Sequence, residues 1–84
     1  MEDGYTPVVV ESFYHTGGGS AHAVRCRPVE GQGLPTTMYV ECSSKMRKIH
    51  PVGTRFRITA KVTDKDGGTP FLYTSHLWPY VVVP

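Results

Sequence analysis

Residues 50–83, HPVGTRFRITAKVTDKDGGTPFLYTSHLWPYVVV, contain the pattern that decides the fold of this 84-residue chain. Apolar and polar side chains alternate without a break from Arg55 to Thr63, which is the period-two pattern of a half-buried β-strand. The side chains expected inside are those of Phe56, Ile58, Ala60 and Val62. The side chains expected outside are those of Arg55, Arg57, Thr59, Lys61 and Thr63.

A hairpin is predicted to follow directly from this strand. Asp64–Gly68, with the sequence DKDGG, contains the Asp-Gly and Gly-Gly pairs that favour a tight turn. Thr69–His76 is rich in β-forming residues and is expected to return beside the first strand. A corner is predicted at Leu77–Pro79, because proline cannot donate a ladder hydrogen bond, and Tyr80–Val83 is expected to form a short last strand.

Three earlier strands are predicted from runs rich in β-branched and aromatic residues, namely Pro7–His15, Ala21–Pro28 and Thr36–Cys42. Glycine-containing loops at Gly17–Ser20 and Val29–Pro35 separate them. The inward positions of the second and third strands are expected to be His22, Val24, Cys26, Met38, Val40 and Cys42. The first strand has no evident inward face, because Val8, Val9 and Val10 are consecutive.

At most one short helical turn is expected near residues 43–49, where Ser43 or Ser44 can cap it and Pro51 prevents a longer helix, and a short turn or a polar loop is the favoured interpretation. Five or six short strands in so small a chain are expected to close into an all-β barrel, because an open sheet would leave its edges exposed. The element order is that of an OB-like barrel, with a Src-homology-3-like barrel as the alternative. Residues 1–6 are expected to be a flexible tail and residues 7–84 a single domain.

Composition indicates a small globular domain, with 39% hydrophobic and 19% charged residues and a net charge of +2. No apolar run is long enough to cross a membrane, and the acidic start, Met1–Gly4, lacks the features of a secretory signal, so the expected location is the cytoplasm. Cys26 and Cys42 are expected to be reduced thiols, at least one of them buried. The cysteines and histidines lack metal-ligand spacing, so neither a metal nor a cofactor is predicted.

Basic residues on the expected outer strand faces predict a binding function. Cations that contact phosphates, together with aromatic rings on which bases stack, are what a single-stranded nucleic-acid groove requires. The residues expected to bind nucleic acid are Arg25, Arg27, Tyr39, Arg55, Arg57 and Lys61, with Lys45, Arg47 and Lys48 as a secondary group. We therefore expect a non-catalytic module for single-stranded or structured nucleic acid, with single-stranded DNA or RNA as its partner. The alternative is a protein-interaction or homo-oligomeric module that uses exposed aromatic residues or an edge strand.

Overall fold

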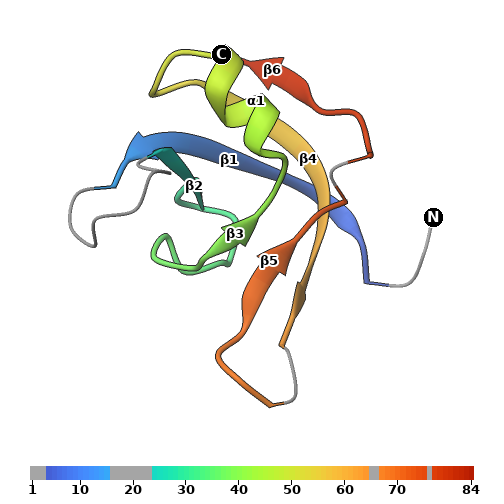
Figure 1. The fold of residues 1–84 in the computed structure, drawn as a ribbon. Coiled ribbons are helices and arrows are strands. Elements are labelled where there is room, and N and C mark those ends of the chain that lie inside the picture. The colour runs from blue at the N-terminus through green and yellow to red at the C-terminus, as the bar shows by residue number, and fades with distance from the viewer. Residues whose placement is uncertain (1–3, 16–23, 65–66, 76) are drawn as a thin grey trace.

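The computed structural model describes residues 4–15, 24–64, 67–75 and 77–84, and within them it contains six strands and one short helix (Figure 1). The elements are β1 (Thr6–Tyr14), β2 (Val24–Pro28), β3 (Val40–Glu41), α1 (Ser44–Ile49), β4 (Arg55–Thr63), β5 (Phe71–Tyr73) and β6 (Val81–Val83). The strands curl into one nearly closed sheet. The predicted small all-β barrel is thereby confirmed.

The strand order is β2-β1-β4-β5-β3, and β6 pairs with β4 beyond the end of β5. β3 runs parallel to β5, whereas the other pairs are antiparallel. The helix between β3 and β4, with β5 returning beside β3, gives the OB-like element order. β2 and β3 lie next to each other and complete the ring, but no ladder joins them within the described residues. We call this gap the β2–β3 seam.

β4 is the central strand, as its alternation predicts. It pairs with β1 on one side and with β5 and β6 on the other. Phe56, Ile58 and Ala60 are buried, which confirms three of the four expected core positions. The prediction for Val62 was wrong, because its side chain is 48% exposed. The β1 ladder ends where Thr6 faces Ala60, so β1 does not extend far enough to pair opposite Val62.

The core also resolves the ambiguous face of β1. Val8 and Val10 are buried and Val9 is only partly so, which places the even-numbered positions of this strand inside. The other buried apolar residues are Cys26, Val40, Met46 and Leu72. Met46 comes from α1, whose first turn is capped by the Ser43 hydroxyl, which accepts a hydrogen bond from the Met46 amide at 3.4 Å. The sequence allowed at most one short helical turn in this region, and the structure contains it as α1.

Three predicted strands are shorter in the structure than in the sequence pattern. The third, expected from Thr36 to Cys42, is reduced to β3, because a turn closed by a hydrogen bond from the Met38 amide to the Pro35 carbonyl occupies its first half. The return strand is reduced to β5, and the last strand to β6. Pro70 and Pro79 lack an amide hydrogen and precede these two short strands closely.

Some expectations fall outside the described residues. They concern residues 1–3 of the tail, the loop at 17–20, the start of the second strand with His22, residues 65–66 of the turn and His76. Thr6, which was assigned to the tail, is the first residue of β1, and the ring of the preceding Tyr5 packs edge-on against Trp78 at 4.7 Å between centroids.

Candidate functional site

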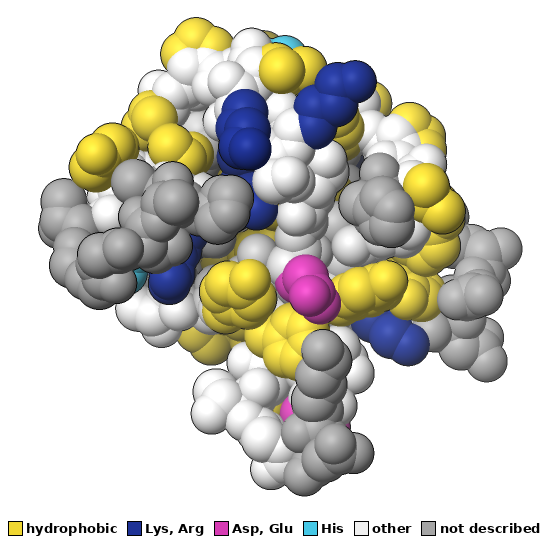
Figure 2. Space-filling model, in the orientation of Figure 1, with side chains coloured by type: hydrophobic (Ala, Val, Ile, Leu, Met, Phe, Trp, Pro, Cys, Tyr) yellow, Lys and Arg dark blue, Asp and Glu magenta, His cyan; other side chains and the backbone are white. Residues whose placement is uncertain are grey.

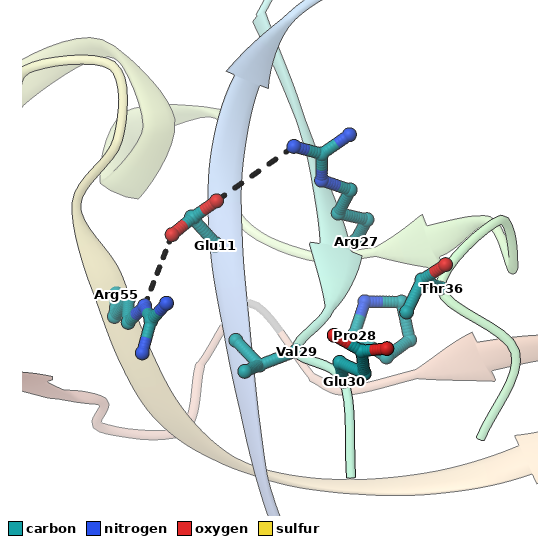
Figure 3. A pocket seen from close by; sticks show the side chains of 7 residues that line it. All are labelled: Glu11, Arg27, Pro28, Val29, Glu30, Thr36 and Arg55. Atoms are coloured by element: carbon teal, nitrogen blue, oxygen red, sulfur yellow. Dashed lines mark hydrogen bonds and ion pairs between the residues drawn. The ribbon is translucent and has the colours of Figure 1, made fainter. Parts of the chain in front are cut away.

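Two of the predicted basic residues meet at one carboxylate on the outer face of the barrel. Antiparallel register places Glu11 of β1 between Arg27 of β2 and Arg55 of β4. The Arg55 Nε lies 3.0 Å from one carboxylate oxygen, and an Arg27 terminal nitrogen lies 3.7 Å from the other (Figure 3). Glu11 therefore offsets part of the positive charge that the sequence pattern placed on this face.

The three charged side chains border a hollow of about 330 Å³, which we call the ion-pair hollow. Its other lining residues are Pro28, Val29, Glu30 and Thr36 (Figure 3). Arg27 and Arg55 remain about half exposed, with 47% and 44% of their side-chain surfaces accessible. Their guanidinium groups are thus positioned by Glu11 yet still open to a further anionic partner.

A second hollow of about 290 Å³ adjoins the first and shares Arg27 and Thr36 with it. We call it the aromatic hollow; its lining residues are Phe13, His15, Arg25, Cys26, Arg27, Thr36, Thr37, Met38 and Tyr39. The Arg27 guanidinium carbon lies 4.7 Å from the centroid of the Phe13 ring, and that of Arg25 lies 6.0 Å from the centroid of Tyr39. These two cation–π pairs place planar groups together in one concave surface.

The aromatic surface continues from Tyr39 to β5, where the Phe71 ring lies 6.3 Å away between centroids. Tyr39 is 53% exposed, so its ring is accessible to a ligand. Its backbone is fixed, because its carbonyl accepts a hydrogen bond from the Leu72 amide at 2.8 Å. A flat aromatic or heterocyclic ligand can stack on such rings, and the neighbouring arginines can contact its anionic groups.

Phe13 is a member of this site that the sequence analysis missed. The missing information was the inward face of β1, which the run of three valines concealed. Once Val8 and Val10 are known to be inside, strand alternation places Phe13 outside, opposite Arg25 of β2.

The structure does not bring the nine predicted residues together. Arg25, Arg27, Tyr39 and Arg55 line the two hollows. Arg57 is exposed two positions along β4 from Arg55, between Val9 of β1 and Val81 of β6, and it lines neither hollow. Lys61 is only half-exposed, and its ammonium nitrogen lies 4.9 Å from the centroid of the Tyr5 ring. It belongs to the opposite end of β4.

The secondary basic group is divided as well. Lys45 and Lys48 are exposed on α1, and Figure 2 shows lysine and arginine side chains gathered at the top of the molecule, in the part where Figure 1 places this helix. Arg47 instead turns toward the barrel. Its Nη1 donates to the Val24 carbonyl at 3.0 Å, and its Nε donates to the Ser43 carbonyl at 3.5 Å. Arg47 thus links α1 to β2.

A side-chain amide holds the loop that forms one wall of both hollows. Gln32 Oε1 accepts a hydrogen bond from the Val9 amide at 2.8 Å, while its Nε2 donates to the Val9 carbonyl at 2.7 Å and to the Val29 carbonyl at 2.8 Å. Gln32 therefore pairs with Val9 much as a residue of a neighbouring strand would. The loop after β2 is attached to β1 by this pairing.

Cys26 lines the aromatic hollow and Cys42 directly follows β3, and both thiols are free. Cys26 is 3% exposed, so the expectation of at least one buried cysteine is confirmed, and Cys42 is half-buried. A side-chain hydrogen bond to Cys42, followed by burial, raises the pKa of Cys26. The same hydrogen bond lowers the pKa of Cys42, and the nearby Arg47 adds to this, while burial and Glu41 oppose it.

No group of three or more histidine, cysteine, aspartate or glutamate side chains suited to a metal ion occurs in the described part of the chain. The same residues include no helix of the length and apolar character needed to cross a membrane. No protein-family model matches the sequence, and neither curated proteins nor solved structures include a significant match.

Proposed function

We propose that this protein is a binding module for single-stranded nucleic acid, which it holds across the aromatic and ion-pair hollows. The observation that supports this most strongly is the pairing of Arg27 with the Phe13 ring and of Arg25 with the Tyr39 ring on one concave surface. Bases stack on aromatic rings and on guanidinium planes, and the same guanidinium groups neutralise phosphates. The two free thiols suit the reducing cytoplasm as the place where binding occurs.

A single strand fits this surface better than a duplex does. The rings line a concave surface of the barrel. They are not carried on a projecting helix that could enter a groove of duplex DNA. Bases can reach such rings only when they are unpaired and turned away from their own stack. The strand path would run from Tyr39, over Phe13, toward Arg55.

Binding can be measured by fluorescence anisotropy with labelled single-stranded DNA, single-stranded RNA and duplex DNA at several salt concentrations. Tyr39→Ala is expected to weaken single-strand binding by about 1–3 kcal/mol, with an almost unchanged salt dependence, because it removes stacking alone. Tyr14→Ala is the matched control, since Tyr14 is 64% exposed but lines neither hollow. Arg25→Gln is expected to reduce the slope of log K against log salt by about 0.7.

The proposal is contradicted if neither strand type binds at low salt, or if Tyr39→Ala and Tyr14→Ala have equal effects. Equal binding of duplex and single strands would mean that the arginines contact phosphates in either ligand. It would contradict the stacking of bases at this site.

A protein-interaction module is the second candidate, and the observation that favours it is the exposure of β6. Val81 and Val82 are 48% and 50% exposed, and among the described residues this strand pairs only with β4. An unpaired apolar edge can add a strand from another chain. Light scattering after size exclusion distinguishes the candidates. The protein-interaction module would be supported if the wild-type protein is a dimer and Val82→Lys converts it to a folded monomer.

A further inference from the structure

We propose that Cys26 and Cys42 form a peroxide-responsive dithiol pair that closes the β2–β3 seam as an intramolecular disulfide. The oxidant that this chemistry requires is a hydroperoxide such as hydrogen peroxide. This proposal does not rest on nucleic-acid binding, because it depends only on the two thiols and their immediate neighbours.

The two cysteines occupy opposite sides of the seam. Cys26 lies within β2, opposite Ser12 of β1, and points into the core. Cys42 directly follows β3 and packs against the same core from the other side. β2 and β3 are neighbours there without a ladder between them in the described residues, and the side chains of Cys26 and Cys42 interact across this gap. A disulfide would supply the missing link there.

The hydrogen bond between the two thiols gives them different roles, because it lowers the pKa of Cys42 and raises that of Cys26. Arg47, held by its contacts with the Val24 and Ser43 carbonyls, adds a cation that favours the thiolate form of either cysteine. Burial and the carboxylate of Glu41 oppose the thiolate at Cys42. Cys26 keeps its proton because it is buried and donates to Cys42. Cys42 is therefore the attacking sulfur, since the thiolate is the reactive form.

The reaction balances with one peroxide per chain. The Cys42 thiolate attacks one peroxide oxygen, the O–O bond breaks, hydroxide leaves, and Cys42 becomes a sulfenic acid. The Cys26 sulfur then attacks the Cys42 sulfur, the S–O bond breaks, and the leaving hydroxide takes the proton from Cys26 and departs as water. The hydroxide of the first step becomes water by taking up the proton that Cys42 released when it ionised. The two thiols lose two electrons in total, and these electrons reduce the peroxide to two molecules of water.

The reduced wild-type protein can be treated with a slight excess of hydrogen peroxide. Its intact mass is then measured, and its disulfide-linked peptides are identified by peptide mapping without reduction. We expect each chain to lose two hydrogen atoms in mass, to remain a single chain and to yield a Cys26–Cys42 linked peptide. Dithiothreitol should restore the starting mass. Cys26→Ser should instead gain oxygen at Cys42, because its resolving thiol is missing.

Arg47→Gln retains both thiols and tests the assigned roles. The variant is expected to form the same disulfide about tenfold more slowly at neutral pH, because less of Cys42 is in the thiolate form. Lys45→Gln, on the exposed side of α1, is the control and should react at the wild-type rate. Three results would overturn the proposal: thiols that persist in peroxide, oxygen addition at Cys42 with Cys26 still free in the wild type, or disulfides that join different chains.

Discussion

Removing the carboxylate of Glu11 should strengthen nucleic-acid binding, which is unusual for a change within a binding surface. Glu11 lies 3.0 Å from the Arg55 Nε and 3.7 Å from an Arg27 nitrogen, so it competes with phosphates for both guanidinium groups. Glu11→Gln keeps the size and the hydrogen-bonding oxygen of the side chain but removes its charge. Both arginines then become fully available to the ligand.

The size of the effect follows from the distances. A phosphate bound by either arginine would lie roughly 4–6 Å from the carboxylate, and at such separations two charges in water interact by about 1 kcal/mol. Relief of one or two such repulsions corresponds to about a 5–30-fold gain in affinity. The slope of log K against log salt should steepen by about 0.7 for each arginine that gains a phosphate. The cost in folding stability should be only about 0–1 kcal/mol, because both ion pairs are exposed.

Anisotropy titrations with labelled single-stranded DNA over a series of salt concentrations measure both quantities, and thermal unfolding checks the fold. Glu30→Gln is the matched control. Glu30 lines the same hollow, but the ion pairs of Arg27 and Arg55 in the described residues are with Glu11. Weaker binding by Glu11→Gln would refute the reasoning, because it would mean that Glu11 orients the arginines for the ligand. Unchanged binding would show that no phosphate reaches the ion-pair hollow.

Three further predictions concern stability and the thiols. Ile58→Ala should lower the free energy of unfolding by about 2–5 kcal/mol in urea titrations, whereas Val62→Ala should change it by less than about 0.5 kcal/mol, since only Ile58 is buried. The alkylation rate of Cys42 by iodoacetamide should reach half its maximum at a lower pH than that of a cysteine in a short peptide, because a lowered pKa leaves more thiolate at any lower pH; a midpoint no lower than that of the peptide would contradict this. The oxidised protein should be more stable than the reduced protein by about 3 kcal/mol, seen as a higher Tm in calorimetry, because the bridge from Cys26 closes a short loop in the unfolded chain.

Strand alternation was sufficient to predict most of the fold. The strict pattern of β4 identified the central strand and three of its four buried positions, because a strand with one face in the core must repeat every two residues. The pattern could not predict Val62, whose exposure depends on where β1 stops pairing. Strand lengths were overestimated for a similar reason: β-forming residues continue beyond the point where a partner strand is present.

The candidate site was only partly predictable. Arg25, Arg27 and Arg55 share a surface because they alternate outward on strands that the fold brings together, and this parity is visible in the sequence. Tyr39 joins them from the position directly before β3. The pairing of Glu11 with two arginines could not be foreseen, because it depends on the register between three strands. The inward turn of Arg47 depends on carbonyl groups of β2 and of residue 43, which no local pattern in α1 reveals.

The attachment of Gln32 to β1 affects how tightly a ligand can be held. A loop that becomes ordered only on binding loses conformational entropy at that moment, and this loss is subtracted from the affinity. Here three hydrogen bonds from one amide side chain already hold the start of the loop in the free protein, and the Leu72 amide holds its end at Tyr39. The wall that presents Tyr39 is therefore ordered in the free protein, so under the proposed function little of the stacking energy of this ring would be lost to ordering the loop.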